Sequence, residues 1–242
     1  MREVQLSGRV AVVTGGSKGI GYSIAEALVR SGANVLICAR HEAEVHEAAE
    51  RLSSLGPGRA VGIRCDMRSE EEVRAMVDRC ATEFGSVDIL INNAGVGRFA
   101  PVDEMTSDHW HQVIETNLNG VFYACHAAIP HMKSRGDGWI INIGSLAGKN
   151  PFAGGAAYNA SKFGLIGFSE AMMLDVRHHG IRVSYIMPGS VATYFNDHTP
   201  SDADAWKIQP EDIAELVLDL VAMPGRTLPS RIEVRPSQPP RK

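Results

Sequence analysis

The stretch from Thr14 to Gly21 reads TGGSKGIG and decides the fold that we predict for this chain. It follows the apolar run Val10–Thr14 and opens a helical pattern, so a tight turn joins a strand to a helix. Glycines in such a turn let the backbone approach a pyrophosphate, whose charge faces the positive end of the helix. The spacing Gly15, Gly19, Gly21 differs from GxGxxG, and no GK[ST] follows as in a Walker A loop. The stretch predicts a dinucleotide site, and a merely tight turn is the alternative.

Short apolar runs alternate with longer amphipathic stretches along the rest of the chain. Several runs are almost wholly apolar, which is typical of parallel strands covered on both faces. The alternation predicts an α/β fold, a single-domain doubly wound parallel sheet of Rossmann type with helices on both faces. We expect this domain at residues 1–235 and a proline-rich tail, loose or extended, at 236–242. The expected strands are Val10–Thr14, Asn34–Ala39, Ala60–Arg64, Val87–Asn92, Trp139–Ile143, Arg182–Met187 and Arg231–Val234. The expected helices are Ile20–Ser31, Glu42–Leu55, Ser69–Phe84, Asp108–Ser134, Tyr158–His178 and Pro210–Met223.

Composition excludes several classes of protein. The net charge of −4 argues against a general binder of nucleic acid or of an anionic membrane, because both need a basic surface. The four cysteines include no CxxC, so we expect neither a disulfide framework nor a metal site. The apolar runs are too short to span a membrane, and the N-terminus shows no signal peptide. We therefore expect a cytoplasmic protein without membrane or nucleic-acid partners.

The end of the second expected strand indicates which dinucleotide is bound. A site for NAD usually places an acid there, about twenty residues beyond the glycine turn, to bind the ribose hydroxyls. This chain has Arg40 at that place, and Lys18 lies inside the glycine turn. Two cations without an acid favour a 2′-phosphate, so we predict NADP(H) as the cofactor. The alternative is that both residues are solvated surface charges.

Further motifs follow the glycine turn in a fixed order. They are Asn92–Gly95 (NNAG), Ser145, the pair Tyr158-x-x-x-Lys162, and Pro188–Gly189. With these motifs the chain resembles the short-chain dehydrogenase/reductase family from about Leu6 to about Thr193. A lone Tyr–Lys pair on a helix surface would be the alternative if the other motifs were missing.

The resemblance implies a catalytic role for four residues: Asn117, Ser145, Tyr158 and Lys162. The phenol would protonate a substrate carbonyl during reduction, and the Ser145 hydroxyl would polarise that carbonyl. The lysine would bind the nicotinamide ribose, and Asn117 would hold a water that links the lysine to solvent. A free phenol has a pKa near ~10, and we expect the lysine ammonium, one helical turn away, to lower it toward neutral pH.

The resemblance also assigns the residues that bind the cofactor. Asp66 is expected at the adenine amino group, although a helix cap is an equally good interpretation of it. Asn92 and Gly95 are expected to line the adenosine ribose, whereas Asn93 could belong to a structural turn and Thr193 to a plain loop. The expected NADP(H)-binding residues are Gly15, Ser17, Lys18, Gly19, Ile20, Gly21, Arg40, Asp66, Met67, Asn93, Ala94, Gly95, Tyr158, Lys162, Pro188, Gly189, Val191 and Thr193.

The substrate is less well defined by the sequence. The pattern is most similar to 3-oxoacyl-acyl-carrier-protein reductases, which implies an NADPH-dependent reduction of a ketone, with the 3-oxoacyl thioester held on an acyl carrier protein. Arg135 lies near a position expected to dock that carrier, but His179 and the ending RIEVRPSQPPRK depart from the pattern. A broad-specificity NADP-dependent alcohol dehydrogenase or ketoreductase is therefore an alternative, and a dinucleotide sensor without turnover is another.

The segment 190–209 would form the substrate lid, and its shortness predicts an open site for a small-molecule carbonyl. Residues expected to line the site are Arg98, Phe99, Phe152, Tyr194 and Phe195. The resemblance further implies a homotetramer, or a homodimer, assembled through the helices expected at Asp108–Ser134 and Tyr158–His178.

Overall fold

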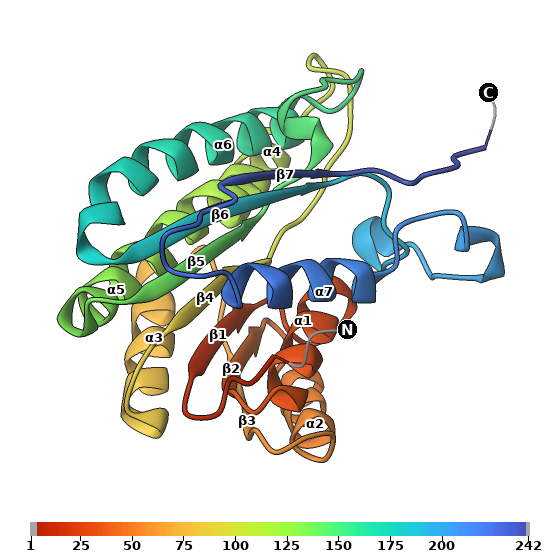
Figure 1. The fold of residues 1–242 in the computed structure, drawn as a ribbon. Coiled ribbons are helices and arrows are strands. Elements are labelled where there is room, and N and C mark those ends of the chain that lie inside the picture. The colour runs from red at the N-terminus through yellow and green to blue at the C-terminus, as the bar shows by residue number, and fades with distance from the viewer. Residues whose placement is uncertain (1–3, 241–242) are drawn as a thin grey trace.

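In the computed structural model, which describes residues 4–240, one parallel sheet lies between two layers of helices (Figure 1). The strands are β1 (Val10–Thr14), β2 (Asn34–Ala39), β3 (Ala60–Arg64), β4 (Ile89–Asn92), β5 (Gly138–Ile143), β6 (Ile181–Pro188) and β7 (Arg231–Val234). They run in the order β3-β2-β1-β4-β5-β6-β7. The order reverses between β1 and β4, and ligands of such sheets bind outside the carboxyl ends of the strands at this switch point.

The helices are α1 (Gly19–Arg30), α2 (Glu42–Ser53), α3 (Glu70–Phe84), α4 (Ser107–Ile114), α5 (Gly120–Arg135), α6 (Ala156–Val176) and α7 (Pro210–Val221). One core cluster joins α1, α2 and α7 to the sheet, and a second joins α3, α5 and α6 to its other face (Figure 1). The side chains of β1 alternate between them, with Val13 in the first cluster and Val12 in the second. This architecture confirms the predicted doubly wound α/β fold.

The predicted helix over Asp108–Ser134 proves to be three consecutive segments. A π-helical turn, Glu115–Asn119, separates α4 from α5. Such turns insert an extra residue into a helix and are frequent at functional sites. The predicted bounds of β1, β2, β3 and β7 are confirmed to the residue. The other predicted elements are found with one or both ends shifted by a few residues: β4 begins at Ile89 and not at Val87, and α6 ends at Val176.

The predicted start of α7 is confirmed in detail. Pro210 occupies the first turn, where its missing N–H costs nothing. The side chains of Gln209 and Asp212 form a reciprocal capping box, and the acidic residues Glu211 and Asp212 lie near the positive end of the helix dipole. The helix therefore begins where its sequence places it.

In residues 4–240, none of the helices combines the length and the apolar character that crossing a bilayer requires. The same residues hold no group of three or more His, Cys, Asp or Glu side chains arranged to bind a metal ion. The domain predicted for residues 1–235 and the tail predicted for 236–242 stay predictions, and residues 1–3 and 241–242 lie outside the described part.

The packing of α2 on β3 yields a test of the fold. A Cβ atom at Gly62 would lie 2.4 Å from the carbonyl oxygen of Val45 in α2. We expect Gly62→Ala to lower the free energy of unfolding by about 1–3 kcal/mol, because the helix must move away from the strand. Urea titration measures this change. The control is Gly225→Ala, since a Cβ there meets nothing within 4 Å. Equal effects of the two substitutions would contradict the observed packing.

Candidate active site

Hydrogen bonds join the end of β1 to the end of β4 at the point where the strand order reverses. The Thr14 hydroxyl accepts from the amides of Asn93 and Ala94, at 3.0 and 3.1 Å, and donates to the Ile91 carbonyl at 3.4 Å. The Asn93 side-chain amide donates to the carbonyls of Thr14 and Gly15, each at 3.0 Å. The glycine turn and the NNAG motif are thus held together, and Asn93 is part of this junction.

The glycine turn has the shape that a bound pyrophosphate needs. Gly15 and Gly19 adopt φ values of 65° and 59°, which side chains disfavour. A Cβ at Gly21 would lie 2.3 Å from the Gly15 carbonyl, so the turn closes only with glycine at this position. The first turn of α1 carries no acidic side chain, and the side chain of its N-cap residue Lys18 makes no capping hydrogen bond to the helix amides. These amides can therefore donate to a phosphate group.

The predicted adenosine-side residues gather at the same edge of the sheet. Arg40 is exposed directly after β2, and Asp66 follows the neighbouring strand β3. Asp66 accepts a two-pronged hydrogen bond from Arg68, which lowers the pKa of the carboxyl below its usual value, and the charge of Arg40 acts in the same direction. The alternative interpretation of Asp66 as the cap of α3 is wrong, because Ser69 accepts from the Glu72 amide at 3.2 Å.

A line of buried amides connects the sheet to α6. Asn92 donates to Asn142 at 2.8 Å, and Asn142 donates to the Ser169 hydroxyl at 2.8 Å. Asn117, inside the π-helical turn, bonds in both directions with the backbone of Val96 and donates to Ser161 of α6 at 3.1 Å. The predicted catalytic asparagine therefore holds the segment after β4 against the helix that carries the tyrosine and the lysine.

The other three predicted catalytic residues lie together at the carboxyl edge of β5. Ser145 follows this strand, and its hydroxyl lies beside the phenol of Tyr158 in the first turn of α6, close enough to lower the pKa of that phenol. The Lys162 ammonium is buried, lies 5.7 Å from the centre of the Tyr158 ring, and donates to the Ile143 carbonyl at 3.0 Å. The arrangement offers a paired hydroxyl and phenol to a ligand oxygen, with a cation behind the ring.

The expected effect of the lysine on the phenol is corrected by the structure. Burial raises the pKa of Tyr158 above its usual value, and the hydrogen bond with Ser145 lowers it only in part. Burial also lowers the pKa of Lys162 to about 8. Desolvation disfavours the charged form of both groups, and the expectation considered the charge alone. The phenol is therefore protonated at neutral pH, as a proton donor must be.

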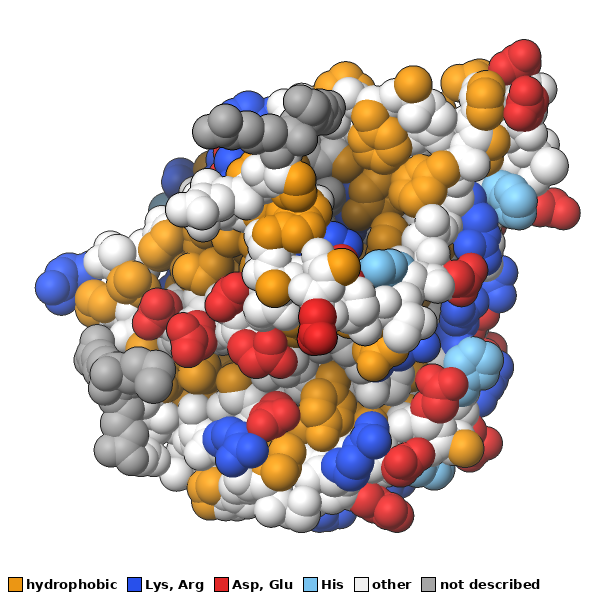
Figure 2. Space-filling view, turned by 90° about the vertical axis from the view of Figure 1, so that its right-hand side faces the viewer, with side chains coloured by type: hydrophobic (Ala, Val, Ile, Leu, Met, Phe, Trp, Pro, Cys, Tyr) orange, Lys and Arg blue, Asp and Glu red, His pale blue; other side chains and the backbone are white. Residues whose placement is uncertain are grey.

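A pocket of about 500 Å³ opens beside Tyr158 and Ser145. Figure 2 views the edge at which the strands end and shows a hollow with largely hydrophobic side chains around it. The lining residues are Ser145, Leu146, Ala147, Asn150, Phe152, Tyr158, Pro188, Gly189, Ser190, Trp206, Arg235, Pro236 and Pro239. Phe152 was expected here. Trp206 and the segment from Arg235 onward were not predicted to line the site, because no motif marks them.

Aromatic side chains from three segments surround the tyrosine ring. The rings of Phe99 and Phe195 lie on Tyr158 with 5.7 Å between centroids, and Phe152 contacts Phe99 at the same distance. These contacts cover part of the tyrosine ring, which remains half-buried at the side of the pocket. Tyr194 lies apart from them, over the ammonium of Lys18 at 5.8 Å. The segment predicted to form the lid thus contacts both the tyrosine and the glycine turn.

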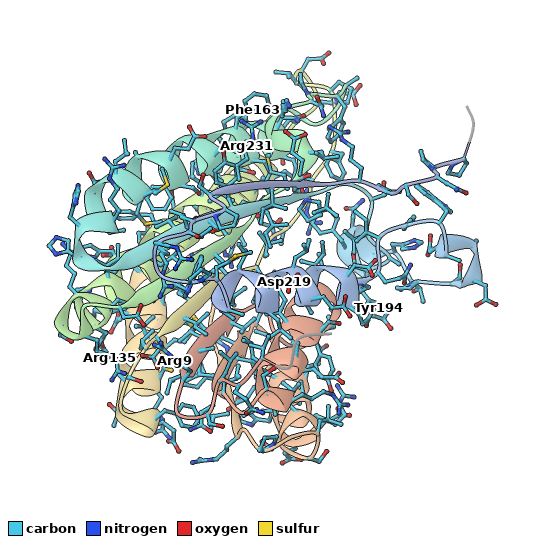
Figure 3. All side chains as sticks on the ribbon, viewed as in Figure 1. Arg9, Arg135, Phe163, Tyr194, Asp219 and Arg231 are labelled. Atoms are coloured by element: carbon cyan, nitrogen blue, oxygen red, sulfur yellow. The ribbon has the colours of Figure 1, made fainter. Side chains whose placement is uncertain are left out.

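Arg135 lies far from this pocket. Its guanidinium pairs with the buried carboxylate of Asp88 at 2.9 Å, where β4 begins. Figure 3 shows Arg135 beside Arg9 at one side of the molecule and Tyr194 of the lid at the other. A carrier docked at Arg135 would therefore meet the edge of the sheet opposite to Tyr158 in the same chain.

Comparisons with known proteins agree with this geometry. The family model for short chain dehydrogenases matches residues 9–204. A 3-oxoacyl-[acyl-carrier-protein] reductase of Vibrio cholerae is 37% identical over 190 residues, 78% of this chain and 76% of that protein. The structure of an alcohol dehydrogenase from the archaeon Thermococcus sibiricus, complexed with 5-hydroxy-NADP, covers 97% of this chain and 99% of its own, with a TM-score of 0.89 and 28% identity. A metagenomic short-chain oxidoreductase in complex with NADP has the same coverage, a TM-score of 0.86 and 37% identity.

The buried lysine yields a prediction about stability. A lysine pKa lowered from 10.5 to about 8 corresponds to a cost of about 3 kcal/mol for the charged form at neutral pH. We expect Lys162→Met to raise the free energy of unfolding at pH 7 by roughly 1–3 kcal/mol, since the lost bond to the Ile143 carbonyl offsets part of the gain.

The sign of its pH dependence follows from the same shift. Between pH 8 and 10.5 the unfolded chain holds the lysine proton and the folded chain has released it, so the wild type gains stability as pH rises. The advantage of the variant should shrink through this window. Urea titrations at pH 7 and pH 10 measure both proteins, and an advantage equal at the two pH values would contradict the lowered pKa.

Proposed function

The chain belongs to the short-chain dehydrogenase family, and from this premise we propose that it is an NADP(H)-dependent carbonyl reductase whose substrate is a 3-oxoacyl thioester. One observation carries the proposal. The phenol of Tyr158 and the hydroxyl of Ser145 line the same open pocket side by side, and the buried Lys162 ammonium lies close to the tyrosine ring. A carbonyl oxygen placed between the two hydroxyls would receive a hydrogen bond and then a proton.

The residues of the glycine turn and of the strand ends fit a dinucleotide. The turn from Gly15 to Gly21 would hold the pyrophosphate, and Arg40 with Lys18 would bind a 2′-phosphate. NADP(H), when bound, supplies the hydride. The chain's own task is to place the substrate, exclude water and deliver the proton. The remaining predicted contacts, from Asp66 to Thr193, belong to this proposal.

The chemistry of the proton donor follows from the environment of the tyrosine. The raised pKa keeps the phenol protonated at neutral pH, which suits reduction of a ketone. The Ser145 hydroxyl, which lies beside the phenol, donates a hydrogen bond to the substrate carbonyl and polarises it. Lys162 stays close to the ring, and its pKa of about 8 leaves most of it charged at pH 7. The negative charge that develops on the substrate oxygen is therefore neutralised by the proton of Tyr158 and stabilised by the nearby positive charge of Lys162.

The substrate class rests on similarity and on pocket shape. The chain is 37% identical to a 3-oxoacyl-[acyl-carrier-protein] reductase, and the pocket is open enough for a chain attached to a carrier. The structural likeness to an alcohol dehydrogenase favours a second candidate, a broad-specificity NADP-dependent alcohol dehydrogenase or ketoreductase. A sensor without turnover would have no need for the complete set of Asn117, Ser145, Tyr158 and Lys162.

A homotetramer or homodimer belongs to the same proposal. Several large apolar side chains are exposed on the helices α4, α5 and α6: Trp110, Phe122, Phe163 and Leu174. Figure 3 shows Phe163 on the outer side of α6, away from the sheet. A row of exposed aromatic side chains is typical of a surface covered by another protein, and a second copy of this chain would cover it.

Tyr158→Phe tests the proton donor. We expect reduction of S-acetoacetyl-N-acetylcysteamine to slow by roughly 10²–10⁴-fold, the usual contribution of general acid catalysis. NADPH binding, measured by the fluorescence of the cofactor, should stay near that of the wild type because the ring remains. Tyr123→Phe on α5 is the matched control. Activity of the Tyr158 variant within about tenfold of the wild type would contradict the assignment.

Arg40→Ala tests the cofactor. We expect kcat/KM for NADPH to fall by roughly 10- to 100-fold, because a charged hydrogen bond contributes about 1.5–3 kcal/mol, and kcat/KM for NADH to stay unchanged. Arg51→Ala on α2 removes another exposed arginine and serves as the control. An equal loss with both cofactors would show that Arg40 does not bind the 2′-phosphate.

A further inference from the structure

The segment that follows β7 forms one side of the pocket. The Gly189 amide donates to the Val234 carbonyl at 2.8 Å, so the chain leaves the sheet beside the Pro188–Gly189 turn. A Cβ at Gly189 would lie 3.1 Å from the Pro236 ring, which shows how closely the two segments pack. Arg235, Pro236 and Pro239 then line the pocket. Proline fixes φ, so this side of the pocket is stiff.

A group of cations surrounds one carboxylate at this place. Glu233 accepts from Lys149 at 2.9 Å, from Arg231 at 3.1 Å and from Arg235 at 3.2 Å. Lys149 is the largest cause that lowers the pKa of Glu233 to about 2, so the carboxylate is ionised. Three positive charges and one negative charge leave an excess of two positive charges. We call these four residues the cation cluster.

The cation cluster adjoins the reacting end of the pocket through two connections. Lys149 follows Ser145 by four residues, and its bond to Glu233 ties the loop after β5 to the strand β7. Arg235 lines the pocket itself. Of the residues in the described chain that line this pocket, Arg235 is the only charged one. The hydrogen bond of Arg235 to Glu233 uses one nitrogen, Nη2, whereas a guanidinium carries five N–H donors.

We propose that Arg235, supported by Lys149, binds an anionic group of the substrate, a carboxylate or a phosphate, at the mouth of the pocket while the carbonyl lies at Ser145 and Tyr158. The fork of a guanidinium matches two oxygens of either group. This inference rests on the proposed function and narrows its substrate class. Two sources share the chemistry: the carboxylate of a short oxo acid, and the phosphate of a carrier bound to the thioester.

Three probes with the same acetoacetyl group test the proposal at saturating NADPH. Acetoacetyl-coenzyme A carries phosphates, acetoacetate carries a carboxylate, and S-acetoacetyl-N-acetylcysteamine is neutral. We expect Arg235→Gln to lower kcat/KM roughly 10- to 100-fold for the anionic probe that is the better substrate, mainly through KM, and to leave the neutral probe within about twofold. Lys149→Gln should show a smaller loss in the same direction. Which anionic probe responds identifies the source.

Controls separate binding from structure. Arg235→Gln leaves Glu233 with Lys149 and Arg231, so the fold should survive, and a melting temperature checks this. Arg235→Lys keeps the charge and should recover part of the affinity. Arg226→Gln removes an exposed arginine from the loop before β7, remote from the pocket lining, and should change nothing.

The outcomes distinguish this inference from the proposed function. Reduction of the neutral probe by the wild type supports a carbonyl reductase, whatever Arg235 does. Equal changes of all three probes in Arg235→Gln, or no change, would overturn the anion site alone. Without turnover of any probe the proposed function fails, and calorimetric titration of coenzyme A and of acetoacetate into the wild type and Arg235→Gln still decides the anion site. Equal affinity of the two proteins for both anions would refute it.

Discussion

One hydroxyl group, that of Thr14, holds the two halves of the sheet together where the site forms. It carries one donor and two acceptor positions, and the structure uses all three on the backbone that ends β4. The side-chain amide of Asn93 donates two further hydrogen bonds to backbone carbonyls of the glycine turn. The positions of the phosphate-binding turn and of the segment that leads to Asn117 follow from this junction. A side chain without a hydroxyl would leave three backbone groups without their partner.

The site is built from polar groups that burial makes costly. Asn92, Asn117 and Asn142 are almost fully buried, and the side-chain nitrogen of each donates a hydrogen bond, whereas Oδ1 of Asn92 has no partner among residues 4–240. Inside the protein such networks are strong when complete and expensive when a member is missing, which makes the arrangement rigid. Lys162 differs, since its buried ammonium donates a hydrogen bond to a backbone carbonyl, that of Ile143, and not to a carboxylate. The tyrosine and lysine are therefore maintained at a cost in stability that the surrounding core must offset.

Most of the fold that the sequence could predict follows from its apolar runs and from the spacing of its glycines. Strands buried on both faces must be apolar, so β1 and β2 were located to the residue. The grouping of Ser145, Tyr158 and Lys162 at one site came from the resemblance to a known family and not from composition. The raised pKa of Tyr158 was not predictable, because it depends on rings from distant segments. The residues after β7 are polar and rich in proline, so nothing in their pattern reveals that Arg235 faces the pocket.

The π-helical turn has a consequence for the whole second layer of the molecule. Successive residues of an α-helix are rotated by about 100°, so the extra residue in Glu115–Asn119 sets the rotation of everything after it. α5 buries Ala124, Ala128 and Met132 against the sheet only at that rotation. Deleting one residue from this turn would leave a regular helix. The buried residues Ala124, Ala128 and Met132 would then be rotated away from the sheet. The π-helical turn thus fixes the rotation of α5 relative to the side chain of Asn117, and this rotation determines which residues of α5 make hydrophobic contacts.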